Sequence, residues 1–393
     1  MPRALWLLII GMAVNSTGSS FLWPLNTIYI HNHLGKSLSM AGVVLMLNSG
    51  ASVIGNLIGG SFFDKYGGYK SILAGIGISL FAIIGLSFWH GWPEYVIFLT
   101  IIGLGTGIIF PAMYAMAGSV WIEGGRKAFN AVYVAQNLGV AIGAALCGIV
   151  AEYSMQLIFL ANALMYIIFL FIAVFGYRNI TVSPVKQKIK PGEPIQVKNK
   201  QNLKALLILC SGYLLCWVAY VQWTTTIASY TQEIHISLSK YSLLWTINGA
   251  LIVLGQPLLS SVLKRWATTL KIQMVTGIII FIISFVVAGN SSAFPGFLAG
   301  MIILTIGEMF IWPAVPTVAF SLSPKGREGF YQGIVNSTAT GGRMIGPLLG
   351  GIIADLYSMS TLFTVLIALF IVAIITTFIY DRVMVTGTVR RQI

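Results

Sequence analysis

Long apolar segments alternate with short polar connections along the whole chain. Each segment holds few charged residues and extends over about 20 residues or more, the length that an α-helix needs to cross roughly 30 Å of hydrocarbon. The segments are continuously apolar, whereas strands of a membrane barrel alternate polar and apolar side chains over about ten residues. The pattern predicts twelve transmembrane helices, at residues 4–30, 39–62, 70–90, 94–121, 128–151, 155–177, 204–231, 240–263, 270–289, 294–320, 330–356 and 359–380.

The second half of the chain repeats the first. GTGIIFPA at 105–112 returns as GEMFIWPA at 307–314, and GVAIGAALCGIVAE at 139–152 aligns without gaps on GRMIGPLLGGIIAD at 342–355. Matching residues are separated by 200 to 203 positions. A match of this length indicates that a unit of six helices has been duplicated.

One long polar segment, rich in Lys and Pro, lies between the two halves. We interpret it as a flexible cytoplasmic tether near anionic lipid headgroups. The predicted organisation is a six-helix bundle at 1–178, a linker at 179–203 and a second six-helix bundle at 204–393. The three cysteines fall within predicted helices, so no disulfide framework is expected.

Composition and charge define the setting. With 57% hydrophobic and 8% charged residues, the chain could not keep its surface in water. Twenty of the 23 Lys and Arg residues fall on one side of the predicted spans, Lys36 and Lys240 fall on the other, and Arg343 lies within a span. We therefore expect a multi-pass protein of a bacterial-type cytoplasmic membrane with both termini in the cytoplasm. The net charge of +13 reports this topology and contact with anionic lipids, not a nucleic-acid partner.

The connection between the second and third spans carries a recognisable motif. GGSFFDKYGGYK at 59–70 resembles the signature loop of the major facilitator superfamily, usually written G-x-L-A-D-R-x-G-R-K. The resembling residues are Gly60, Asp64, Lys65, Gly67 and Lys70. Together with the duplication, the resemblance implies an all-α membrane protein of twelve helices in two pseudo-symmetric six-helix bundles, related by an axis normal to the membrane.

Physical chemistry suggests a role for this loop. Gly60 would let two helices approach closely, and the Asp64 carboxylate could lie at the N-terminus of a neighbouring helix, where the helix dipole favours an anion. In the resembled family the loop braces the outward-facing state, which implies a cytoplasmic latch. The alternative is a short capped turn with one surface acid.

Small residues at four-residue spacing mark the fifth and eleventh spans. They resemble the antiporter motif of drug:proton exchangers, although the stronger copy here lies in the second half, and the Arg usual in the fourth span is absent. Such a stripe permits close helix contact, and Pro permits bending, so we expect either a hinge or tight packing. The residues are Gly139 and Gly143 in the first half, and Gly342, Gly346, Pro347 and Gly350 in the second.

Two opposite charges lie near the middle of their spans, Glu308 and Arg343. An ionisable side chain at that depth costs at least roughly 2.5 to 3.5 kcal/mol on insertion scales, so it normally faces a cavity or a partner. We expect a buried acid and a buried base at one depth. Three roles stay open, namely proton coupling at Glu308, a structural ion pair, and direct binding of a charge on the cargo.

Polar and aromatic residues in the spans are candidates for the rest of a binding pocket. Aromatic rings beside few charges favour a large amphiphilic cargo, although each residue alone could equally serve interhelical hydrogen bonding. The candidates are Asn15, Ser19, Trp23, Asn48, Thr106, Gln136, Gln222, Trp223, Trp245, Asn248 and Trp312.

The sequence holds no Walker loop, metal cluster or catalytic triad, so we expect neither an enzyme nor a cofactor other than a coupling proton. The predicted function is proton-coupled export of amphiphilic small molecules by a monomer resembling the drug:proton antiporter branch of the family. The alternatives are proton-coupled uptake of a sugar, organic anion or other metabolite, with Arg343 binding an anion, and a non-transporting receptor or scaffold.

Overall fold

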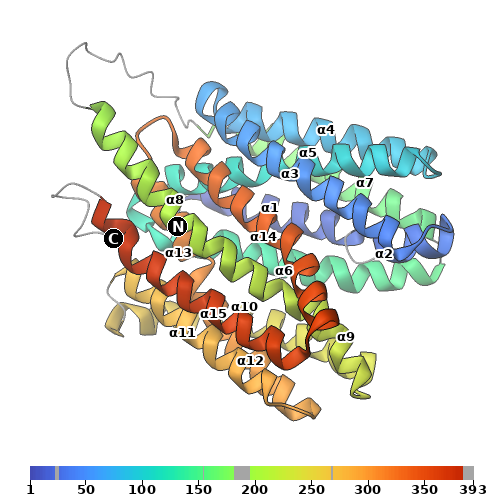
Figure 1. The fold of residues 1–393 in the computed structure, drawn as a ribbon. Helices are drawn as coiled ribbons and strands as arrows, with labels where there is room; N and C mark the ends of the chain where they lie inside the picture. The colour runs from blue at the N-terminus through green and yellow to red at the C-terminus, as the bar shows by residue number, and fades with distance from the viewer. Residues whose placement is uncertain (23–25, 154, 181–194, 267–268, 384–393) are drawn as a thin grey trace. The chain divides into compact units, whose positions relative to one another are not determined.

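The computed structural model describes residues 1–22, 26–153, 155–180, 195–266 and 269–383 (Figure 1). These residues are almost entirely helical, and they include no β-strand. Residue contacts divide the chain into two compact units. The first unit comprises Met1–Gln187 together with Lys325–Ser337, and the second comprises Lys188–Pro324 together with Thr338–Ile393.

The first unit is built from six long helices and a short outer connection. Within it α5 packs between α3 and α4, and α1 packs against α6 and α7, as the ribbon also shows (Figure 1). A π-helical turn at Tyr29–His33 follows the short α2, and another at Ala173–Tyr177 extends α7. The helices are α1 (Arg3–Leu22), α2 (Asn26–Ile28), α3 (Leu38–Tyr66), α4 (Gly68–Phe88), α5 (Glu94–Val120), α6 (Arg126–Tyr153) and α7 (Met155–Ile172).

The second unit repeats this pattern of packing. Its α11 lies against α12 and α15, α8 lies against α15, and α10 lies against α12. The helices are α8 (Ile195–Tyr220), α9 (Thr226–Glu233), α10 (Leu238–Trp266), α11 (Leu270–Gly289), α12 (Phe294–Ile311), α13 (Ala314–Leu322), α14 (Glu328–Leu356) and α15 (Met359–Ile379). The first turns of α14 belong to the first unit and the remainder of α14 belongs to the second.

Each of the twelve predicted spans coincides with helix in the described residues, which confirms the predicted all-α membrane fold. Within the described residues, ten helical stretches are long and apolar enough to cross a membrane. The other two predicted spans, α10 and α14, are helical as well. In α14 the polar residues concentrate in the first half, where Asn336, Ser337, Thr338 and Thr340 follow one another closely.

One predicted boundary needs correction. Most of the predicted linker, residues 181–194, lies outside the described residues, but α8 begins at Ile195 rather than at 204. Its first turns carry Lys and Gln, which suit a helix but fall outside the apolar run. The tenth predicted span is one apolar stretch, Phe294–Leu322, in which a turn at Trp312 and Pro313 separates α12 from α13. Pro313 has no N–H to donate to the Met309 carbonyl, and the Gln256 amide donates to that oxygen instead, at 3.3 Å.

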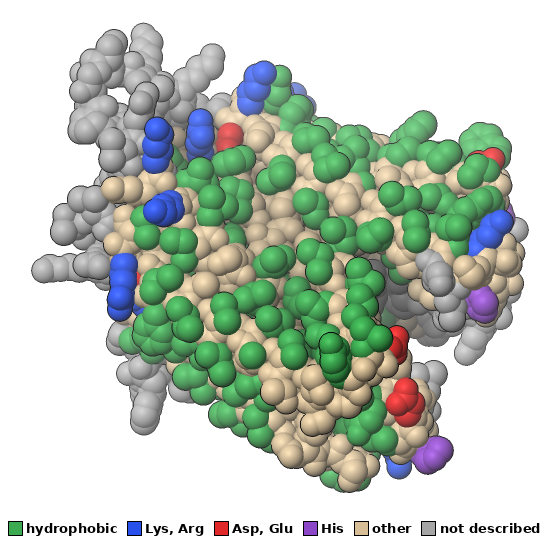
Figure 2. Space-filling view, viewed as in Figure 1, with side chains coloured by type: hydrophobic (Ala, Val, Ile, Leu, Met, Phe, Trp, Pro, Cys, Tyr) green, Lys and Arg blue, Asp and Glu red, His purple; other side chains and the backbone are tan. Residues whose placement is uncertain are grey.

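The outer flanks of both units are apolar. Large hydrophobic side chains are strongly exposed there, including Phe81 at 68%, Leu254 at 71% and Leu348 at 64%. Figure 2 shows hydrophobic side chains spread over the helix flanks, while the Lys and Arg visible in this view lie near helix ends. Exposed apolar surface on this scale requires a hydrocarbon environment.

Candidate functional site

Among the described residues of the second unit, a single acid lies in the interior. Glu308 on α12 is 2% exposed. Its Oε1 accepts a hydrogen bond from Asn248 Nδ2 on α10 at 2.8 Å, and the same nitrogen donates to Thr305 Oγ1 at 2.9 Å. The Tyr220 hydroxyl on α8 is a further hydrogen-bond partner of the Glu308 carboxylate. Three helices therefore meet at this carboxylate.

The predicted base lies close to the same hydroxyl. Arg343 on α14 acts on Tyr220 through its positive charge, while Glu308 acts on Tyr220 through its negative charge. The Arg343 guanidinium lies over the Trp217 ring, 4.9 Å from the ring centroid, and donates to Thr340 Oγ1 at 3.3 Å. Tyr220 is thus within electrostatic range of both charges that the sequence places in the middle of their spans.

The expectation that both charges are buried holds for Glu308 only, because Arg343 is exposed. The physical reason is the way α14 packs on α8. Gly342 and Gly346 bring the backbone of α14 against α8, so the long Arg343 side chain lies across the face of Trp217 instead of entering the helix interface. A guanidinium on an aromatic face gains about 0.5 to 2 kcal/mol from the ring quadrupole.

Aromatic side chains surround this pair of charges. The Trp217 and Trp312 rings are stacked with centroids 4.3 Å apart and planes 10° apart, and Tyr213 and Tyr220 each meet Trp312 edge-on at 5.5 Å. We call Trp217, Trp312 and Tyr220 the aromatic platform. Sequence reasoning proposed Trp312 but missed Trp217 and Tyr220. Their spacing of three residues on one helix face was the available signal.

Two pocket candidates of the second unit serve the local structure. The Gln222 side chain is fully buried, and its Nε2 donates to the carbonyl oxygens of Val218 at 2.9 Å and Gly346 at 2.7 Å. Trp223 is fully buried and meets Phe285 edge-on. Gln222 and Trp223 lie at the break between α8 and α9, where these contacts satisfy backbone groups and fill the core.

A third candidate lies beside the platform. Trp245 on α10 meets Tyr220 edge-on at 6.4 Å and donates from Nε1 to the Tyr241 hydroxyl at 2.9 Å. That hydroxyl donates in turn to the Trp223 carbonyl oxygen. The structure therefore brings Trp245, Asn248 and Trp312 together around Tyr220 and Glu308.

The candidates of the first unit form a separate, uncharged set. Asn15 is fully buried, and its amide has no hydrogen-bond partner within the described part of the chain. Ser19 lies within 3.3 Å of the Tyr166 hydroxyl, and Asn48 donates to the Leu99 carbonyl oxygen at 2.6 Å. Two further candidates are also hydrogen-bonded: Thr106 donates to the Ile102 carbonyl oxygen, and Gln136 Oε1 accepts from the Tyr114 hydroxyl. Trp23 lies outside the described residues.

The signature loop makes the contact that its chemistry suggests. Asp64 Oδ1 accepts from the Gly329 N–H at 2.7 Å, and Oδ2 accepts from the Phe330 N–H at 2.9 Å. Both N–H groups belong to the first turn of α14, whose dipole favours an anion. Gly60 lies directly against the Gly329 backbone, and no side chain would fit between them. The gating role of this contact stays a prediction.

The other residues of the motif support the turn. Gly67 has φ of 85° and separates α3 from α4, a conformation that favours glycine. The Lys65 ammonium lies over the Tyr66 ring at 5.0 Å from its centroid. Lys70 lies in the first turn of α4 and is exposed.

The contact between α3 and the start of α14 extends further than the motif. Gly333 lies against the Asn56 carbonyl oxygen, and the Ser337 hydroxyl donates to the Val53 carbonyl oxygen at 3.0 Å. The small residues Gly329, Gly333 and Ser337 thus face α3 at four-residue spacing. Sequence reasoning missed this stripe because it examined the later glycines of the same helix.

Those later glycines are packing positions in this structure. Gly139 and Gly143 on α6 lie against the α1 backbone, and Gly342 and Gly346 lie against the α8 backbone. Gly350 faces the Gln222 side chain, and Pro347 lies inside the continuous α14. The hinge role of these residues stays a prediction.

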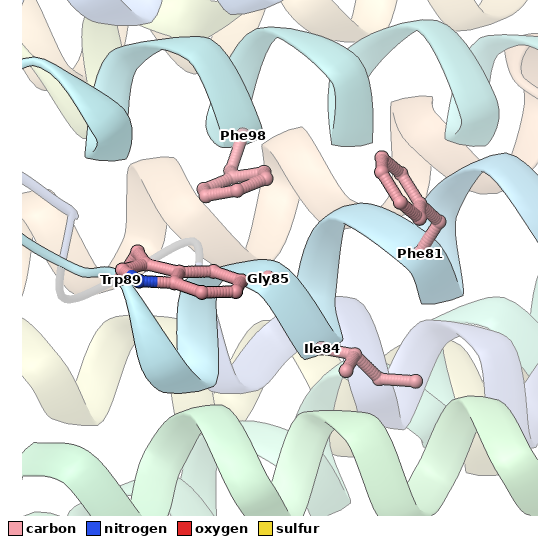
Figure 3. A pocket seen from close by; sticks show the side chains of 5 residues that line it. All are labelled: Phe81, Ile84, Gly85, Trp89 and Phe98. Atoms are coloured by element: carbon pink, nitrogen blue, oxygen red, sulfur yellow. The ribbon is translucent and has the colours of Figure 1, made fainter.

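A separate apolar depression lies on the first unit. Phe81, Ile84, Gly85 and Trp89 at the end of α4 line it together with Phe98 of α5 (Figure 3). Phe81 and Trp89 are strongly exposed, so the depression opens on the lipid-facing flank. It contains no charged group, and it is distinct from the site at Glu308. The described residues also include no cluster of His, Cys, Asp or Glu that could hold a metal ion.

Comparison with known proteins defines the class. The sequence profile of the Major Facilitator Superfamily matches residues 8–268 and 208–391, so the chain belongs to this family of membrane transporters and is not an enzyme. It is 62% identical to the uncharacterized MFS-type transporter YttB of Bacillus subtilis (strain 168), over 97% of this chain and 96% of that protein.

More distant relatives carry functional names. The chain is 26% identical to a Na(+), Li(+), K(+)/H(+) antiporter of Planococcus maritimus over 88% of each chain. It is 22% identical to the multidrug resistance protein MdtH of Shigella dysenteriae, over 86% of this chain and 83% of that one. The crystal structure of the human organic anion transporter MFSD10 shares the fold, with a TM-score of 0.75, 13% identity and coverage of 96% of this chain and 100% of that chain.

Proposed function

We propose that this transporter exports amphiphilic small molecules in exchange for protons, and that Glu308 is the proton site. The observation that carries the proposal is a buried carboxylate on α12 that is held by side chains from α8 and α10. Such a group is expensive to keep in a membrane and is expected where protons or ions move. Among the described residues of the second unit it is the one buried acid near the middle of a span.

The chemistry requires that the proton affinity of Glu308 changes during transport. Donation from Asn248 and Tyr220 favours the ionised carboxylate, as does the positive charge of Arg343 nearby. A movement that separates α12 from α10 or α8 would remove those donors and favour the protonated form. Each proton that enters the cell gains about 2.3 kcal/mol per 100 mV of membrane potential, which can drive export against a gradient.

The aromatic platform supports an amphiphilic cargo. Flat apolar rings bind a planar or hydrophobic molecule without requiring a fixed set of hydrogen bonds. The few polar groups nearby set the orientation of that molecule. The names of the two distant relatives, one an antiporter and the other a multidrug resistance protein, agree with this proposal.

We further propose that the chain acts as a monomer in a bacterial-type cytoplasmic membrane, with both termini in the cytoplasm and anionic lipids around its basic loops. The charge distribution supports this orientation, because Lys and Arg are concentrated in alternate connections. Proton-coupled uptake of an organic anion is a second candidate. The exposed Arg343 favours it, since a guanidinium is a natural partner for a carboxylate, sulfonate or phosphate.

Everted membrane vesicles test the proposal. Respiration acidifies their lumen, and a dye that reports luminal acidity shows whether added cargo drives protons out. Dyes, biocides and common metabolites are the cargo panel. We expect at least one amphiphilic compound to dissipate the gradient with the wild-type protein, and Glu308→Gln to reduce this at least tenfold. Glu233→Gln, which removes an exposed acid of the same unit, is the matched control.

Two results would reject the proposal. One is an undiminished proton response in Glu308→Gln. The other is a response to organic anions alone that runs as uptake together with protons, which would establish the second candidate instead.

A further inference from the structure

The bonds around Glu308 form a chain with a fixed direction. The Thr305 hydroxyl donates to the Met301 carbonyl oxygen at 2.7 Å, and a hydroxyl has one hydrogen to give. Thr305 Oγ1 can therefore only accept from Asn248, so the NH₂ group of Asn248 must face it. The second hydrogen of that NH₂ group points to Glu308 Oε1 at 2.8 Å. Thr305 thus fixes which end of the amide Glu308 meets.

We propose that Asn248, oriented by Thr305, is a positioning residue whose hydrogen bond to Glu308 changes in strength with the protonation state of that carboxyl group. Through this bond the proton on Glu308 is linked to the contact between α10 and α12. This inference rests on the proposed role of Glu308 as the proton site. Asn248 donates a charge-assisted bond to the ionised carboxylate, and such bonds are roughly twice as strong as neutral ones. Protonation weakens that bond, and α10 then holds α12 less firmly.

Burial increases the effect of protonation on the hydrogen bond between Asn248 and Glu308. Thr305 is fully buried, Glu308 is 2% exposed and Asn248 is 6% exposed, so water cannot replace a weakened bond at little cost. Tyr220 on α8 is hydrogen-bonded to Glu308, and Tyr241 on α10 and Arg343 on α14 act electrostatically on Tyr220 as well. The α10 helix contributes the neutral Asn248, and α11 contributes the Phe281 ring against Gly307. Asn248 is therefore the residue that links α10 to the Glu308 carboxylate by a hydrogen bond.

In the first half of the chain, the residue that matches Asn248 has no matching Thr and Glu as partners. Asn48 occupies the place of Asn248, but Gly103 and Thr106 occupy the places of Thr305 and Glu308. Asn48 accordingly donates to a backbone oxygen, that of Leu99, at 2.6 Å. The amide recurs in both halves as a helix contact, and only in the second half do Thr305 and Glu308 make that contact depend on a proton.

Infrared difference spectroscopy of the purified protein tests the proposed role of Asn248 and does not require a cargo molecule. The C=O band of protonated Glu308 is identified by its absence in Glu308→Gln, and the pH at which it appears is measured. Asn248→Leu removes a donor to the ionised form, so the band should appear about one pH unit higher. Thr305→Val frees the amide to turn and should shift the band in the same direction by a smaller amount. Thr246→Val, which removes an exposed hydroxyl from α10, is the matched control.

Hydrogen exchange supplies the second readout. In the wild type, peptides covering 244–252 should exchange faster below the pH at which the band appears, and in Asn248→Leu they should exchange fast on both sides of it. Asn248→Ser covers the case in which the leucine variant does not fold. An unchanged band in Thr305→Val and both Asn248 variants would overturn the inference. A shifted band without proton-coupled transport in vesicles would instead sink the proposed function alone.

Discussion

Asp64 closes the first turn of α14 by accepting hydrogen bonds from the N–H groups of Gly329 and Phe330, at 2.7 and 2.9 Å. Bonds from N–H groups to a carboxylate contribute about 1.5 to 3 kcal/mol each. We predict that Asp64→Asn opens this turn. Hydrogen exchange of peptides covering 326–336 should accelerate at least tenfold. Asp355→Asn, at the exposed end of the same helix, should leave that exchange unchanged. Equal exchange in Asp64→Asn and the wild type would remove the latch role.

The close approach of α3 and α14 at Gly333 leads to a second prediction. A methyl group at this position would meet the Asn56 carbonyl oxygen, so Gly333→Ala must push the two helices apart. We expect transport in vesicles to fall at least tenfold. Gly341→Ala is the matched control, because a methyl group there meets only a Leu214 side chain at an ordinary contact distance of 3.6 Å. Similar rates in the two variants would show that the contact does not take part in transport.

The turn at Pro313 leads to a third prediction, in which replacing the proline raises stability and lowers transport activity. Pro313→Ala restores an N–H that can donate to the Met309 carbonyl oxygen, so α12 and α13 can join into one helix. We expect the melting temperature to rise by a few degrees and transport to fall. Thermal unfolding in detergent and the vesicle assay measure these two effects. A variant that is less stable than the wild type would show that the break is required by packing, not by movement.

The stacking of Arg343 on Trp217 can be measured by a double-mutant cycle. Arg343→Gln, Trp217→Leu and the double variant should show a coupling energy of about 0.5 to 2 kcal/mol, the range of cation–π contacts. Unfolding in mixed micelles supplies the free energies. The same cycle with Trp89→Leu, on the lipid-facing flank of the first unit, should give additive changes. Additivity in both cycles would mean that the ring contact contributes no stability.

Helices and their repeat were predictable because they depend on local chemistry. Apolar runs fix the spans, and the Gly and Pro matches between halves fix the duplication. The turn after Ile311 could not be predicted from its proline alone. Pro111, at the matching place in the first half, lies inside a continuous helix. At Pro313 the Gln256 side chain, from another helix, donates to the Met309 carbonyl oxygen, a contact that no local pattern reveals.

The site was predictable only in part. Glu308 and Arg343 stood out because charges in the middle of a span are costly. Their surroundings did not stand out, because Asn248 and Glu308 are sixty residues apart and Trp217 lies among apolar neighbours that mask it. The exposure of Arg343 was unpredictable for a similar reason, since it follows from how closely Gly342 and Gly346 approach α8.

The uncharged counterpart of the acid, Thr106 in place of Glu308, has a consequence for biogenesis. The membrane-spanning segments of the first half can partition into the bilayer one after another without an Asp, Glu, Lys or Arg at their centres. Glu308 emerges from the ribosome only after α8 and α10, which carry its partners Tyr220 and Asn248, have been synthesised. The order of synthesis therefore spares the nascent chain an unaccompanied charge in lipid.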